Sequence, residues 1–184
     1  MPRHAHAPNE LDLVLSFINS AQLERRFELF DSTESLSGWL HGRRLLSTHL
    51  AAEDGDVDVA IAVREALRDL AGANCGLSMP DASSARLDAV SLACGLRPRF
   101  DPGGGVSLAP EVGGVAGALG RLLGIVVAAV GTGDWSRVKT CRNPACRWAF
   151  FDATRNRSAV WCDMAVCGSR AKSRRYHARQ RSPT

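Results

Sequence analysis

Residues 141–181 read CRNPACRWAFFDATRNRSAVWCDMAVCGSRAKSRRYHARQR, and this stretch decides the fold of the C-terminal part of the chain. It holds four cysteines with the spacing C-x4-C-x15-C-x4-C, namely Cys141, Cys146, Cys162 and Cys167. Each close pair supplies two thiolates from one tight loop, as a tetrahedral zinc site requires. The spacing therefore predicts one structural Zn2+ ion, whose four thiolates leave no open position for catalysis.

The order of segments in this stretch predicts a treble-clef-like finger made of a knuckle, a β-hairpin and a basic helix. Residues 147–153 and 159–162 are the predicted strands, joined by the turn TRNRS. Cys162 and Cys167 are five residues apart, about 140° around a helix, so a turn must separate them or the helix must begin only near Gly168.

The aromatic residues of the finger have two interpretations. They are Trp148, Phe150, Phe151 and Trp161. Exposed, they would be stacking platforms for bases. In so small a module we expect them instead to form its entire core.

A helix is predicted from Gly168 to Arg181. This helix is basic, because no acidic residue follows Asp163. From residue 137 onward the chain has 12 basic and 2 acidic residues, whereas residues 1–136 have 11 basic and 17 acidic. This split indicates that a polyanion-binding charge belongs to the finger. Arginine forks suit phosphates and guanine edges. The expected DNA contacts are Lys139, Arg155, Arg157, Arg170, Lys172, Arg174, Arg175 and Arg179.

The sequence before the finger predicts a helical domain with one small β-hairpin, so the whole chain is expected to be mostly α (α+β). Apolar spacing and capping residues predict helices over about residues 11–18, 36–50, 56–70, 81–95 and 110–130, and a hairpin over 96–109 around the turn DPGGG. In the third helix the predicted buried stripe is Ala60, Val63, Leu67 and Leu70, and the predicted solvated face is Arg64, Glu65, Arg68 and Asp69.

The predicted helix over 110–130 is apolar nearly all round, so a membrane span is the alternative. Arg121 lies in its middle, and five glycines between residues 113 and 124 make it narrow. Each glycine costs about 1 kcal/mol relative to alanine, so the glycines require a packing reason. We interpret the segment as a buried helix that a neighbour approaches closely, within the chain or across a homodimer.

The remaining composition indicates neither export nor catalysis. No secretion or other targeting segment is visible, so a reducing cytoplasm is expected, where thiolates bind metal more often than they form disulfides. Cys75 and Cys94 stand apart and are predicted to be buried apolar residues. Residues 1–136 show no nucleophile elbow, metal-ligand spacing or nucleotide-binding loop, so no enzyme is expected.

Residues 138–179 resemble the bacterial CGNR zinc finger. The signature stands here as Cys167, Gly168, Ser169 and Arg170, with serine in place of asparagine, and Lys172, Tyr176 and Arg179 continue the resemblance. The preceding domain is similar to the one called ABATE, through residues 17–20 and 63–68. The resemblance implies a stress-related transcription regulator whose N-terminal domain senses a ligand.

Together these observations predict a DNA-binding regulator of transcription. Residues 135–184 would be the zinc finger on DNA, and residues 1–134 would sense an unknown small-molecule effector or form a homodimer. Two alternatives stay open. One is an RNA-binding or protein-interaction module that uses the same basic surface, and the other is an enzyme in the N-terminal domain.

Overall fold

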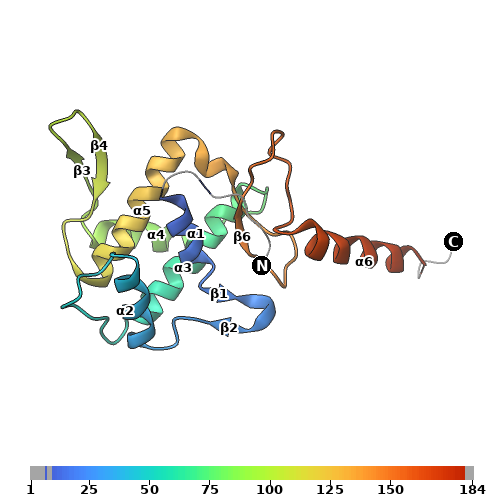
Figure 1. Cartoon of the computed structure of the whole chain (residues 1–184), viewed down its shortest axis with the longest axis horizontal. Helices are drawn as coiled ribbons and strands as arrows, with labels where there is room; N and C mark the ends of the chain where they lie inside the picture. The colour runs from blue at the N-terminus through green and yellow to red at the C-terminus, as the bar shows by residue number, and fades with distance from the viewer. Residues whose placement is uncertain (1–6, 8–9, 181–184) are drawn as a thin grey trace.

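The computed structural model describes residue 7 and residues 10–180, except for the side chains of Arg175, Ala178 and Arg179. The helices are α1 (Leu11–Ile18), α2 (Thr33–Gly42), α3 (Asp56–Ala73), α4 (Asp81–Ala93), α5 (Gly114–Thr132) and α6 (Ser169–Gln180). Short helical turns are η1 (Leu23–Arg25), η2 (Asp134–Arg137) and the π-helical η3 (Met164–Gly168). Antiparallel strand pairs are β1 (Ala21–Gln22) with β2 (Phe27–Glu28), β3 (Arg97–Phe100) with β4 (Val106–Ala109), and β5 (Val138–Thr140) with β6 (Ala149–Phe151). The prediction of a mostly α fold with small strand pairs is confirmed (Figure 1).

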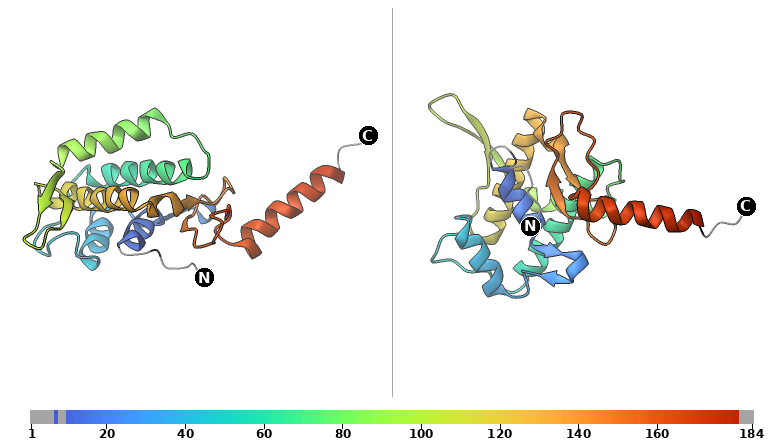
Figure 2. Two further views of the ribbon diagram at one scale, coloured as in Figure 1. Left: turned by 90° about the horizontal axis from the view of Figure 1, so that it is seen from above. Right: turned by 45° about the vertical axis from the view of Figure 1, so that its right-hand side comes forward.

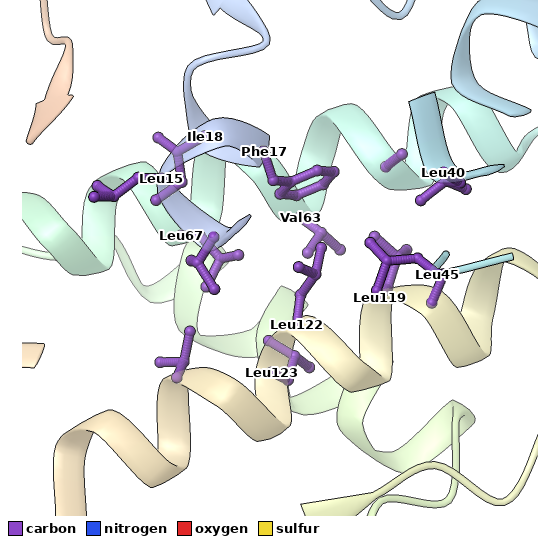
Figure 3. Packing of buried hydrophobic residues seen from close by; sticks show 14 of the residues in the cluster. Leu15, Phe17, Ile18, Leu40, Leu45, Val63, Leu67, Leu119, Leu122 and Leu123 are labelled. Carbon is purple, nitrogen blue, oxygen red and sulfur yellow. The ribbon is translucent and has the colours of Figure 1, made fainter. Parts of the chain in front are cut away.

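The main core lies where α1, α3 and α5 meet. Figure 3 shows side chains of these helices directed toward one another, among them Phe17, Val63 and Leu122, each fully buried. Burying such a side chain away from water stabilises the folded state by about 1.5–3 kcal/mol. The predicted stripe of α3 is confirmed at Ala60, Val63 and Leu67.

Helix α2 ends at Gly42, so the prediction that it continues to about residue 50 is wrong. Arg44 adopts a left-handed conformation (φ 56°), and its N–H donates to the carbonyl of His41. The N–H of Leu45 donates to the carbonyl of Leu40 at 3.0 Å. These bonds form a Schellman cap, which ends the helix and turns the buried Leu45 back into the core.

Two arginines of α3 correct the sequence interpretation. Arg64 and Arg68 were expected on the solvated face, but only 2% of Arg64 and none of Arg68 is exposed. Arg64 forms a bidentate ion pair with Glu28 of β2, at 2.5 and 2.7 Å. Arg68 donates to main-chain carbonyls, so both guanidinium groups are buried with partners.

Two glycines in the middle of α5, Gly120 and Gly124, face neighbours within the chain. A Cβ atom on Gly120 would lie 2.7 Å from Sγ of Cys94, and one on Gly124 would lie 2.6 Å from the carbonyl oxygen of Leu108. Packing within the chain therefore explains these two glycines without a dimer. Helix α5 has the length and composition of a membrane span, but 56% of its 18-residue apolar stretch is buried within the protein. Core helices of soluble proteins can be equally long and apolar, so one such helix is weak evidence for a span.

Part of the finger segment belongs to the main core. Trp135, Val138 and Ala149 belong to the same buried cluster as the helices, and Phe151 packs against it. Strand β6 pairs with β5, with Thr140 opposite Ala149, whereas residues 159–162 form no strand. The expected hairpin between residues 147–153 and 159–162 is therefore wrong in its second strand. Helix α6 extends away from the rest of the protein in each view (Figure 1, Figure 2).

Candidate metal centre and adjoining basic surface

The four predicted cysteines come together in one cluster. The Sγ atoms of Cys141, Cys146, Cys162 and Cys167 all lie within 4.8 Å of one another. Sγ of Cys162 is 3.7 Å from that of Cys146 and 3.8 Å from that of Cys167. A regular tetrahedron with Zn–S bonds of about 2.3 Å has edges of about 3.8 Å. The donor set therefore fits one structural zinc ion.

The first pair lies in a knuckle at the end of the β5–β6 hairpin. The carbonyl of Asn143 accepts hydrogen bonds from the N–H groups of Cys146 (2.9 Å) and Arg147 (3.0 Å), which folds the loop back. The buried Asn143 amide lies 4.0 Å from Sγ of Cys167. Such N–H donors orient metal thiolates and offset their charge.

The second pair is separated by the wide turn that the sequence required. Cys162 precedes Asp163, whose carboxylate accepts from the N–H of Val166 at 2.9 Å and caps η3. Cys167 lies within this π-helical turn, and α6 begins only at Ser169. The prediction of a turn, with a helix beginning near Gly168, is confirmed.

Crowding of the thiols shifts their ionisation in opposite directions. Hydrogen bonds from Cys146 and Cys162 lower the pKa of the Cys141 thiol to about 2. The Cys141 group in turn raises the pKa of Cys146 to about 12 and also raises the pKa of Cys162. Adjacent thiolates repel one another, so a divalent cation is needed before all four ionise together.

Lys139 was predicted to contact DNA, but its ammonium group is buried. Only 6% of Lys139 and 1% of Asp152 is exposed, and Nζ lies 2.7 Å from Oδ2 of Asp152. Nζ also donates to the carbonyl of Arg157. Burial alone would raise the pKa of Asp152, but hydrogen bonds from Lys139, Thr154 and the N–H of Ala159 lower it. Lys139 therefore orders the loop 152–159 and is unavailable to a partner.

The other predicted contacts are more accessible. The exposed ones are Arg155, Arg157, Arg170, Lys172 and Arg174. Arg157 donates to the hydroxyl of Ser136 at 3.2 Å. Arg175 and Arg179 belong to α6, but their side chains, like the whole of Arg181, lie outside the described residues.

Three polar side chains that the sequence interpretation missed hold the finger on the helices. Asn19 pairs with both main-chain polar groups of Ala149, at 2.8 and 2.9 Å. Arg68 donates to the carbonyls of Ile18 (2.5 Å) and Arg147 (3.0 Å). Asn74 donates to the carbonyls of Trp135 and Val138. Each of these side chains replaces a main-chain partner, so the interface is polar as well as apolar.

The β1–β2 hairpin also reaches the finger. Glu24 in η1 forms an ion pair with Arg170 in the first turn of α6, and both side chains are partly exposed. The sequence does not reveal this contact, since the two positions are 146 residues apart. It places the hairpin tip beside the start of the basic helix.

Comparison with known families matches the two parts of the chain in the expected order. A family model described as CGNR zinc finger matches residues 137–180, which include all four cysteines. A model described as "ABATE: Putative stress-induced transcription regulator" matches residues 11–132. Neither description names an enzyme. No curated protein matches the chain.

Proposed function

The chain belongs to the ABATE family and carries a CGNR zinc finger, and from this premise we propose that it regulates transcription by binding duplex DNA through that finger. In this proposal residues 135–184 contact DNA. Residues 1–134 bind a small-molecule effector or form a homodimer. A cytoplasmic location belongs to the proposal, because reduced thiolates remain available to zinc there.

The observation that carries the proposal is the position and charge of α6. All side chains described on this helix are exposed except that of Ala171, which is half-buried. The helix has 12 residues, hence a length of about 18 Å, and extends away from the protein (Figure 2). An α-helix fits the major groove of B-DNA, which is about 12 Å wide. A basic helix without a packing partner is therefore suited to enter that groove.

Zinc has a supporting role in this arrangement. Cys167 is a predicted ligand and lies two residues before α6 begins at Ser169. Isolated helices shorter than about 12–15 residues are only marginally stable in water. A metal at the base of α6 would fix the direction of the helix and stabilise its first turn.

Arg170 and Arg174 are four residues apart, so they share one face of α6. Guanidinium groups contact phosphates or the edges of guanine with two hydrogen bonds. We propose this face as the one directed toward DNA. Arg155 and Arg157 would contact phosphates beside it.

The test is a selection from random DNA duplexes, followed by binding measurements at several salt concentrations. We expect enrichment of a defined sequence and a steep fall of affinity with salt. Replacing Arg170 and Arg174 with alanine should reduce the slope of log K against log salt by about 1.8, for two lost phosphate contacts. The matched control is the same change at Arg86 and Arg99, which are exposed on α4 and β3.

RNA hairpins and single strands serve as competitors in the same assay. Enrichment of no DNA sequence, together with tighter binding to RNA, would support the alternative of an RNA-binding module. Equal effects of the Arg170/Arg174 and Arg86/Arg99 changes would show that α6 is not the contact surface.

A further inference from the structure

The tip of the β1–β2 hairpin carries two neighbouring basic residues, Arg25 and Arg26. Arg25 and Arg26 are exposed, and within residues 10–180 no hydrogen bond or ion pair engages their guanidinium groups. Arg26 also takes a left-handed conformation (φ 52°), which glycine adopts at lower cost. These two arginines are therefore available to a partner.

The neighbouring Glu24 connects this tip to the finger. Its carboxylate pairs with Arg170, at the start of α6. Arg174 lies one turn further on the same face of the helix, so the hairpin tip lies next to the face proposed to meet DNA. The phosphate backbones border the major groove, so an element beside the entering helix meets phosphates.

We propose that the tip at residues 23–26 is a second DNA-contacting element; this inference rests on the proposed function. In the free protein, the carboxylate of Glu24 occupies the position beside Arg170 that a DNA phosphate takes in the complex. Arg25 and Arg26 contact the DNA backbone. Arg170 exchanges the carboxylate of Glu24 for a phosphate when DNA binds.

The exposure of the Glu24–Arg170 pair makes this exchange feasible. The side chains of Arg170 and Glu24 are 51% and 40% exposed. Ion pairs open to water contribute little to stability, whereas guanidinium–phosphate pairs are commonly bidentate. Arg170 therefore loses a weak partner and gains a stronger one.

The base of the hairpin is rigid, so its tip is held in position before DNA arrives. Glu28 of β2 accepts two hydrogen bonds from the buried Arg64 and one from the N–H of Phe30 at 2.9 Å. Contacts that are already ordered lose less entropy on binding. Arg64 thus positions the tip without touching DNA.

The first experiment replaces both Arg25 and Arg26 with alanine and measures binding of the full zinc-loaded chain to duplex DNA. We expect at least a tenfold loss of affinity at low salt. The slope of log K against log salt should fall by about 1.8, for two lost phosphate contacts. The Arg86→Ala/Arg99→Ala variant removes the same charge and should change affinity less than twofold. In Figure 1, β3 and α6 lie at opposite ends of the protein.

The second experiment tests the exchange itself with Glu24→Gln, Arg170→Ala and the double variant. Glu24→Gln should bind DNA several-fold more tightly, because it removes a repelling charge and frees Arg170. Arg170→Ala should cost more affinity in the Glu24→Gln background than in the original chain. Equal costs in both backgrounds would overturn the exchange.

The outcomes separate this inference from the proposed function. Absence of duplex binding by the unaltered chain would overturn both. Binding that depends on Arg174 but is unchanged by Arg25→Ala/Arg26→Ala would overturn the inference alone. Unchanged thermal unfolding of the hairpin variants confirms that a loss of binding is not a loss of folding.

Discussion

The guanidinium group of Arg68 donates a hydrogen bond of 3.0 Å to the main-chain carbonyl of Arg147, the residue that follows the metal ligand Cys146. Arg68 is fully buried in α3, and its other Nη atom donates to Ile18 at the end of α1. A single cation therefore joins two helices to the metal loop. The position of the metal centre depends on the helical part of the chain.

Replacing Arg68 with Met should destabilise the protein strongly. Methionine fills much of the space but leaves the carbonyls of Ile18 and Arg147 buried without this donor. Loss of a buried, hydrogen-bonded cation costs about 2–5 kcal/mol. Urea unfolding measures this loss, with Arg86→Met on the exposed face of α4 as control. A loss below about 1 kcal/mol would contradict the bracing role.

Glu28 should make the stability depend on pH in a defined direction. Burial would raise the pKa of its carboxyl, but the hydrogen bonds from Arg64 and from the N–H of Phe30 lower it below the ordinary value of 4.5. The ionised group therefore stabilises the fold above about pH 4.5, and this contribution disappears as the pH falls through the lowered pKa.

The measurement compares the free energy of unfolding of the original chain and Glu28→Gln between pH 7 and pH 3. The difference should be largest at neutral pH and should shrink below pH 4.5. Glu53→Gln removes an exposed carboxylate and should show little difference at any pH. A difference that grows toward pH 3 would have the wrong sign for this ion pair.

The buried arginines mark where sequence interpretation failed. Charged side chains of a helix are ordinarily expected to face solvent, and this expectation places Arg64 and Arg68 on the outer face of α3. On a helical wheel they lie about 40° and 80° from the buried Ala60, which is within or beside the apolar stripe. That angle was a signal in the sequence. Their partners were not, because Glu28 and Arg147 are distant in the chain.

The metal ligands were predictable, because two close pairs of cysteines at this spacing are the sequence pattern of a tetrahedral zinc site. The strand pairing around them was not. Strand β5 begins before Cys141, and its buried Lys139 breaks the apolar pattern of a strand. Only the three-dimensional fold brings Asp152 against Lys139, which converts an expected DNA contact into part of the core.

Glycine at position 124 should be required by close packing. A Cβ atom there would lie 2.6 Å from the carbonyl oxygen of Leu108, so Gly124→Ala must displace β4 or α5. Overpacking of this kind costs about 1–3 kcal/mol. Gly131 is the control, since nothing lies within 4 Å of its Cβ position in the same helix. Gly131→Ala should raise the free energy of unfolding by up to about 1 kcal/mol. Similar effects at both positions would contradict the packing explanation.

Removing one metal ligand should unfold only part of the finger. Cys146→Ser leaves three thiolates, and structural zinc supplies on the order of 10 kcal/mol to small modules. The β5–β6 pair should persist, because Val138 and Ala149 are buried in the main core and Asn19 holds Ala149. Residues 162–180 lack such support and should lose amide-exchange protection.

Metal analysis and hydrogen exchange of the full chain test this order. Cys146→Ser should lose the single equivalent of zinc, and protection should fall in η3 and α6 but remain in β5 and β6. Cys75→Ser is the matched control, since Cys75 is outside the cluster and its Sγ lies 3.4 Å from the carbonyl of Thr140, within reach of a hydroxyl. That variant should keep its zinc. Zinc retained at one equivalent in Cys146→Ser would overturn the ligand assignment, whereas simultaneous loss of protection in β5–β6 would show that the metal also supports the shared core.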